Sequence, residues 1–149
     1  MCFAYARGKK NKSFVTSNWG YNRQMKDIET RQDLELLLTD FYKIAPTDAE
    51  IGHHFDGIDL VAHLPIIVDF WEKVLFGKPV YFNNPLQVHQ ILHDKSPLTL
   101  EHFQRWVEIF TTTIDKNFAG TQAENAKLRA KMIAHSLNQN LNLSTEKVE

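Results

Sequence analysis

The chain has 149 residues, with 17 Lys and Arg against 18 Asp and Glu, and its hydrophobic content of 43% is typical of a globular protein. This length is enough for one domain with a substantial core and excludes two. No apolar run reaches the ~20 residues needed to cross a bilayer, and no apolar stretch at the start is long enough for a secretory signal.

We divide the chain into three parts: a basic extension over 1–26, a single domain over 27–139 and a polar tail over 140–149. The extension carries six Lys and Arg and no acidic residue. Such a segment suits a nucleic-acid or membrane tether, a transit-like leader or a solvated extension, and we adopt the last and expect no nucleic-acid partner. Cys2 is the one cysteine, which excludes a disulfide framework and favours a reducing, cytoplasmic setting.

The apolar spacing after the extension is helical, without sustained two-residue alternation, so we predict an all-α fold. The first helix is predicted over 31–45. Thr30 and Asp33 have the spacing of a capping box at its start, and Pro46 ends it. A short helical turn is expected over 49–55.

The second long apolar stripe covers 60–74 and includes His63, and Gly77 marks its C-terminal end. Pro65 conflicts with this stripe, because proline inside a helix removes one N–H and clashes with the preceding turn. We therefore expect either that this helix starts late, with Pro65 in its first turn, or that it is kinked there.

A short helix is predicted over 85–93, because Asn84 is a good N-cap and Pro85 suits the first helical position. A long helix should follow, with Thr99 as its N-cap and an end at Phe118.

The last helix is predicted to begin at a capping box formed by Thr121 and Glu124. Its inner stripe consists of small and medium apolar residues: Ala126, Ala130, Ile133 and Leu137. We expect the chain from Asn138 onward to be frayed.

His89 lies near the middle of the short helix, whose caps fix the helix start and hence the direction of the imidazole. A lone histidine on a helix face is more often a core residue than a ligand. His93 follows four residues later, so a zinc site shared with a third ligand such as His63 stays open at this point.

Five segments in this order and spacing resemble the truncated haemoglobins, and within them the third group. They span about residues 30–138 and comprise Phe41-Tyr42, Ile51-Gly52-His53-His54-Phe55, His63 with Phe70-Trp71, Asn84-Pro85-Leu86 with His89, and His102-Phe103 with Trp106. The resemblance implies a globin-like, two-over-two helical sandwich that encloses haem b.

The resemblance also implies roles for individual residues. His89 would be the proximal ligand of the haem iron, with its other ring nitrogen donating to a backbone carbonyl. Tyr42, His63 and Trp106 would be the polar distal residues that stabilise a bound ligand. The pocket wall would consist of Phe55, Ile67, Phe70, Phe103 and Met132. Tyr81, His93 and Lys95 are candidates for contacts with the haem propionates.

The residues leave simpler interpretations open for the distal side. Tyr42 fits a core aromatic residue with its hydroxyl at the rim, and Trp106 is core-like by periodicity. His53, His54, His102 and His135 are interpreted as surface or partly buried residues without a further role.

The function that the resemblance implies is high-affinity binding of dioxygen and other diatomic ligands by a monomeric protein. A hydroxyl or indole N–H near the ligand would stabilise the partial negative charge on its outer oxygen. One alternative is an enzyme, a nitric-oxide dioxygenase or a peroxidase-like protein, which would need an external reductase as a partner. Another is a haem-free helical interaction module.

Overall fold

The computed structural model describes residues 25–143, which form five α-helices and contain no strand. The α-helices are α3 (Arg31–Ile44), α4 (Leu60–Phe76), α5 (Pro85–Lys95), α6 (Leu100–Asn117) and α7 (Thr121–Asn138). Shorter helical turns are η2 (Ala45–Thr47), η3 (Gly52–Phe55) and η4 (Gln139–Leu143). The all-α prediction is confirmed. Most of the predicted basic extension over 1–26 and the end of the predicted tail lie outside the described residues.

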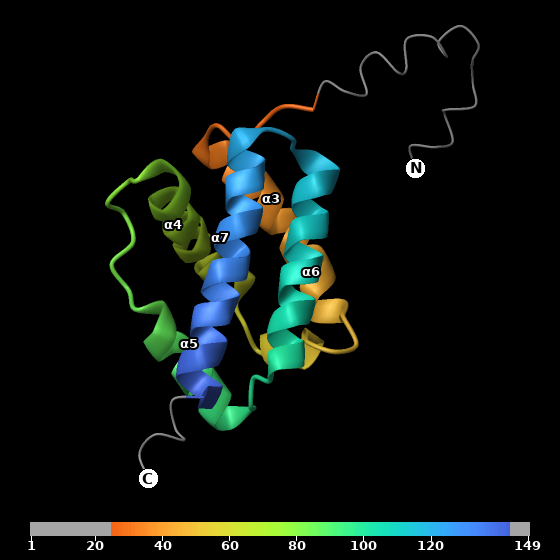
Figure 1. The fold of residues 1–149 in the computed structure, drawn as a ribbon, viewed down its shortest axis with the longest axis vertical. Coiled ribbons are helices and arrows are strands. Elements are labelled where there is room, and N and C mark those ends of the chain that lie inside the picture. The colour runs from red at the N-terminus through yellow and green to blue at the C-terminus, as the bar shows by residue number, and fades with distance from the viewer. Residues whose placement is uncertain (1–24, 144–149) are drawn as a thin grey trace, which may run out of the picture.

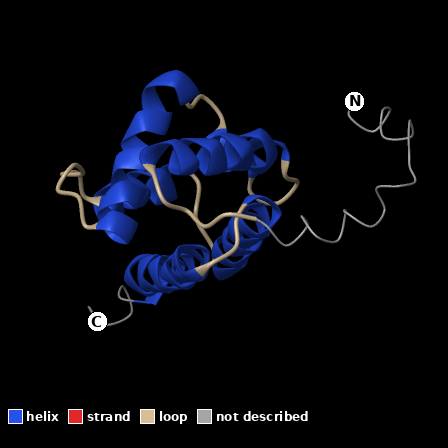
Figure 2. Ribbon diagram, turned by 90° about the horizontal axis from the view of Figure 1, so that it is seen from above, coloured by secondary structure: helices blue, strands red, loops and turns tan. Residues whose placement is uncertain are grey.

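The long helices form two pairs that stack on each other (Figures 1 and 2). Helix α3 packs against α4, and α6 packs against α7. Contacts between α3 and α6 and between α4 and α7 join the two layers. None of the described helices is long and apolar enough to cross a membrane.

The main core lies between the layers and is rich in aromatic rings. Phe110 of α6 is fully buried and stacks on Trp71 of α4 at a centroid distance of 4.9 Å. Phe41 of α3 meets Phe110 edge to face at 5.5 Å. Alanines at Ala126 and Ala130 of α7 are fully buried, and their small side chains let α7 approach its neighbours closely.

Several helix ends lie where local capping signals predicted them. The Thr30 side chain accepts a hydrogen bond from the Asp33 backbone N–H, and the Asp33 side chain closes the capping box at the start of α3. Gly77 adopts the left-handed conformation (φ 70°) at the end of α4. Asn84 caps α5 with Pro85 in its first turn.

Pro65 lies inside α4, because this helix begins at Leu60. The Asp59 side chain fixes that start by accepting hydrogen bonds from the N–H groups of Val61 and Ala62. A late start at Pro65 is therefore wrong, and His63 belongs to the helix rather than to the loop before it.

The predicted capping box of Thr121 and Glu124 at the start of α7 is wrong. Gly120 is the N-cap, and the first-turn N–H groups are capped by Asp27 from the opposite end of the sequence. Its carboxylate accepts from the N–H groups of Gln122 (2.8 Å) and Ala123 (2.7 Å). A Cβ on Gly120 would lie 2.4 Å from the Asp27 carboxyl carbon, so glycine is required where the two segments meet.

The segment after Asn138 is ordered rather than frayed as far as Leu143. Leu141 of η4 is buried in a second, smaller apolar cluster with Leu98, Phe103, Ala134 and Leu137. The Asn142 side chain donates to the Leu98 carbonyl oxygen at 2.9 Å. These contacts hold the end of α7 against the loop between α5 and α6.

Candidate functional site

His89 is held in one orientation by its own helix. Its Nδ1 lies 2.7 Å from the carbonyl oxygen of Pro85, one turn earlier in α5. A carbonyl oxygen can only accept, so Nδ1 carries the proton and donates, which leaves the lone pair on Nε2. The ring therefore offers one free nitrogen, in a direction fixed by the capped start of α5.

The surroundings of His89 keep the imidazole neutral. Burial lowers its pKa, while the hydrogen bond to Pro85 acts in the opposite direction and is outweighed. A neutral imidazole with Nδ1 protonated is the form that binds a metal ion through Nε2.

His63 of α4 lies close enough to His89 for the two rings to influence each other. The pKa of His63 is lowered, first by burial and then by the repulsion that it would meet from a protonated His89. His63 also contacts the ring of Tyr42 edge to face, with centroids 6.1 Å apart. Side chains from α3, α4 and α5 thus interact with one another through His63.

The Tyr42 hydroxyl makes no hydrogen bond to another described residue. Burial raises the pKa of Tyr42 to about 12, so the phenol is protonated at neutral pH and can donate. No hydrogen bond joins this hydroxyl to another group within residues 25–143. A half-buried hydroxyl with no partner among these residues is available to a ligand that accepts a hydrogen bond.

Trp106 joins the pocket side chains to the core. Its indole stacks on Phe110 with centroids 5.2 Å apart and an interplanar angle of 6°, and it packs against both apolar clusters. This packing agrees with the core-like position that the periodicity indicates for Trp106. In the described part of the chain its indole N–H has no hydrogen-bond partner.

Four of the predicted wall residues are buried or half-buried near these groups. Phe55 contacts the Tyr42 ring at 5.7 Å, and Ile67 packs against the main core. Phe70 meets Tyr81 edge to face at 5.2 Å. Phe103 lies in the second cluster, against which the α5 side chains Leu86 and Leu92 also pack.

Met132 does not fit the predicted wall. It is 52% exposed, and it lies about 200° around α7 from the buried Ala130 at ~100° per residue. The residue was placed in the wall by sequence resemblance, but the inward stripe of α7 runs through Ala130 and Ala134. We leave Met132 out of the proposed pocket.

The three residues predicted to contact the haem propionates differ in exposure and in hydrogen bonding. Tyr81 is buried, which raises the pKa of its hydroxyl. His93 Nδ1 accepts the N–H of Leu98 at 3.0 Å and so ties the end of α5 to the following loop. Lys95 is exposed at the end of α5.

The zinc site considered for His63, His89 and His93 is not formed. Within residues 25–143, the one group of three potential ligands that lie together is His53, His54 and His102. His102 also completes the capping box of Thr99, because its Nδ1 accepts the Thr99 N–H at 3.1 Å.

The sequence interpretation gave these three histidines no role. Burial, together with the charges of His53 and His102, lowers the pKa of His54 to about 4. Two signals were available in the sequence: the adjacent pair His53-His54, and the position of His102 three residues after the N-cap Thr99.

A search with protein-family models and a search of curated sequences give no match. A comparison of folds does find a solved relative. The crystal structure of a group III truncated haemoglobin from Campylobacter jejuni matches this chain with a TM-score of 0.71 and 25% sequence identity. The match covers 80% of this chain and 97% of the other. The chain has the fold of a truncated haemoglobin.

In this truncated-haemoglobin fold, three of the residues singled out by sequence lie on α3, α4 and α5 and interact with one another. His89 approaches from α5, and Tyr42 and His63 lie on α3 and α4. The two-over-two arrangement predicted from the resemblance is confirmed by the structural match and by the pairing of the helices.

Proposed function

We propose that the domain over 27–139 binds haem b and that the complex binds dioxygen or another diatomic ligand. The observation that carries this proposal is the state of His89. Its Nδ1 donates to Pro85, its Nε2 is left to bind iron, and its pKa is lowered. In metal-binding histidines the second nitrogen commonly donates to a carbonyl or carboxylate in this way.

The residues present fit a flat, largely apolar group with iron at its centre. Phe55, Ile67 and Phe70 are half-buried apolar side chains that pack onto the main core and supply a wall. Phe103 continues this wall toward α5, which carries His89. When bound, haem would supply an iron centre that takes up a diatomic ligand reversibly, and His89 would hold that iron.

The chain's own residues then decide how tightly that ligand is held. The Tyr42 hydroxyl is protonated and has no hydrogen-bond partner among the described residues, so it can donate to the ligand. The Trp106 indole N–H is a second donor. His63 contacts the Tyr42 ring and interacts electrostatically with His89. A hydrogen bond in such a partly dry pocket is stronger than in water.

The absorption spectrum of the purified full-length chain, mixed with haem and recorded in ferric and dithionite-reduced states, tests this proposal. We expect one equivalent of haem per chain, an intense Soret band, and a shift of that band when carbon monoxide is added to the reduced protein. Haem that stays free in solution, with no Soret band of a bound form, would rule the proposal out.

A further inference from the structure

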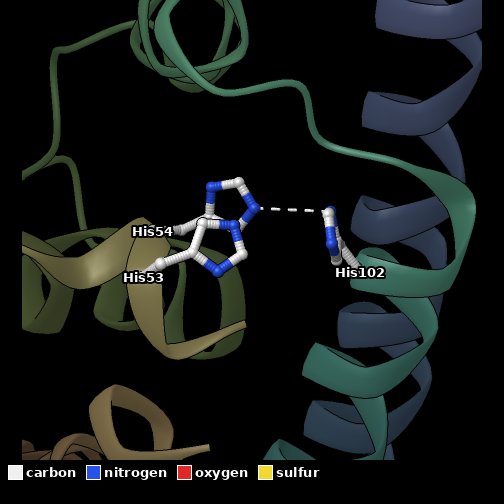
Figure 3. Close-up of side chains that lie close together, drawn as sticks. All are labelled: His53, His54 and His102. Carbon is white, nitrogen blue, oxygen red and sulfur yellow. Dashed lines mark hydrogen bonds between the residues drawn. The ribbon is translucent and has the colours of Figure 1, made fainter. Parts of the chain in front are cut away.

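Three histidines that are not part of the proposed haem pocket meet between η3 and the first turn of α6. His53 and His54 come from η3, and His102 comes from α6 (Figure 3). One ring nitrogen from each lies within 4.8 Å of the others. The fold brings these elements together across 48 residues of sequence.

The spacing of two of these nitrogens is that of metal ligands. His54 Nε2 and His102 Nδ1 are 3.3 Å apart. Two imidazole nitrogens bound to one tetrahedral Zn²⁺ at ~2.0–2.1 Å are separated by roughly 3.3 Å. Little movement of these two rings is needed to place an ion between them.

The hydrogen bonding of this cluster is incomplete without an ion, which is a separate observation. His54 is buried, with 6% of its surface exposed, and its Nε2 faces His102 Nδ1. Its other ring nitrogen, Nδ1, has no hydrogen-bond partner among the described residues and would carry the proton when Nε2 binds an ion. His102 Nδ1 already accepts the Thr99 N–H at 3.1 Å, so a proton on His54 Nε2 must compete for the same lone pair. Buried polar groups in proteins are rarely left in this state.

We propose that His53, His54 and His102 bind a divalent transition-metal ion of the class that prefers imidazole, with Zn²⁺ as its representative. Three nitrogen ligands without a carboxylate suit Zn²⁺, Cu²⁺ or Ni²⁺ and do not suit Ca²⁺ or Mg²⁺, which require oxygen ligands. Three imidazoles leave a fourth position of a tetrahedral ion for water.

The exposure of His53 and the fixed backbone beside His54 fit this site. His53 is exposed and its ring makes no hydrogen bond within residues 25–143, so it can turn toward the ion. His54 is held because Gly52 packs against η2, where a Cβ would lie 2.5 Å from the Pro46 carbonyl oxygen. An ion bound at His102 Nδ1 would replace the hydrogen bond from the Thr99 backbone N–H. The other half of the capping box remains, because the Thr99 hydroxyl still accepts from the His102 backbone N–H.

Zinc titration of the haem-loaded full-length chain tests this proposal, with isothermal calorimetry for affinity and atomic emission for stoichiometry. The background carries Cys2→Ser, which removes the one thiol of the chain. We expect one Zn²⁺ per chain, and at least a tenfold loss of affinity in His53→Ala and in His102→Gln. His53 is the most informative change, because it is exposed and its removal leaves the fold intact.

His135→Ala is the matched control, because His135 is an exposed histidine outside the cluster and should leave zinc affinity unchanged. The same pair of titrations in a His89→Ala background, without haem, makes the result independent of haem binding. The proposal is overturned if the parent chain binds no Zn²⁺, or if His53→Ala and His102→Gln bind it as tightly as the parent does.

Discussion

Helices α6 and α5 follow each other in sequence but are held in place in different ways. Helix α6 buries five side chains, four of them in the two apolar clusters, with Phe110 fully buried between aromatic rings. Helix α5 buries none of its residues, and its Val88 and Ile91 are about half exposed. The two layers formed by α3, α4, α6 and α7 are thus stabilised by their own packing. Helix α5 is held by hydrogen bonds at its ends and by the partial burial of Leu86 and Leu92, so it is the part that a bound group can stabilise most.

The largest expected effect comes from removing an aromatic ring from these two layers. Phe110→Ala leaves a cavity between Trp71 and Trp106 and should lower the free energy of unfolding by about 4 kcal/mol. Urea denaturation of the haem-free protein measures this.

The matched change on α5 is Ile91→Ala, at a side chain that is 55% exposed. It should change the free energy of unfolding by no more than about 0.5 kcal/mol. Equal losses of unfolding free energy in Phe110→Ala and Ile91→Ala would show that α5 and α6 do not differ in this way.

The next effect concerns how haem acts on α5. In the haem-free protein the amides of α5 should exchange with solvent faster than the central amides of α6, because α5 has no fully buried side chain and packs only through the partly buried Leu86 and Leu92. At a free haem concentration 100 times Kd, binding adds about 2.7 kcal/mol of stability, which should slow the exchange of α5. Hydrogen exchange measured by mass spectrometry tests this expectation. Exchange rates of the α5 amides that are the same with and without haem would contradict it.

A smaller loss of stability is expected from removing Asp27, which caps α7. Asp27→Ala removes both side-chain caps of α7 and should cost about 2 kcal/mol of stability at neutral pH. Thr121→Ala is the control, because the Thr121 side chain caps nothing and its loss should be close to neutral. If urea denaturation shows a larger loss of stability for Thr121→Ala than for Asp27→Ala, the capping box predicted from sequence is present after all.

The same carboxylate makes this difference depend on pH. Burial acts to raise the pKa of Asp27, but the hydrogen bonds from Gln122, Ile28 and Ala123 outweigh it and lower the pKa below its ordinary value of 3.8. A lowered pKa in the folded state means that the stabilisation is complete above the unfolded pKa and is lost as the pH falls through the folded value. The gap between parent and Asp27→Ala should therefore narrow below about pH 4.

The smallest effect is on ligand release from the proposed pocket. Tyr42→Phe removes one hydrogen bond to the ligand, of about 1.4 kcal/mol, and should speed oxygen dissociation about tenfold. Tyr81→Phe, which removes the hydroxyl of a buried tyrosine whose ring packs against Phe70, is the control and should leave the rate unchanged. A stopped-flow rate for Tyr42→Phe equal to that of the parent would make Tyr42 a core aromatic residue only.

Local signals made much of the fold predictable. The capping residues Thr30 and Asn84 and the terminating Gly77 act through neighbours in sequence, so the helix ends that they set can be read from the chain. The orientation of His89 follows from the same cause, since its partner Pro85 is one helical turn away.

Features that depend on distant contacts were not predictable in this way. The cap of α7 comes from Asp27, which is 95 residues from Gln122, and an adequate local candidate at Thr121 concealed it. The meeting of His54 with His102 likewise depends on how η3 and α6 pack. The exposure of Met132 is set by the rotation of α7, which a resemblance in sequence order does not determine.

The central claim is that His89 binds iron through Nε2, and the reduced absorption spectrum of a His89→Gly variant with added imidazole tests it most directly. The account predicts that His89→Gly loses the spectrum of the parent haem complex, that free imidazole restores it, and that His93→Gly keeps it without imidazole. A His89→Gly protein that retains haem with the parent spectrum in the absence of imidazole would contradict the account.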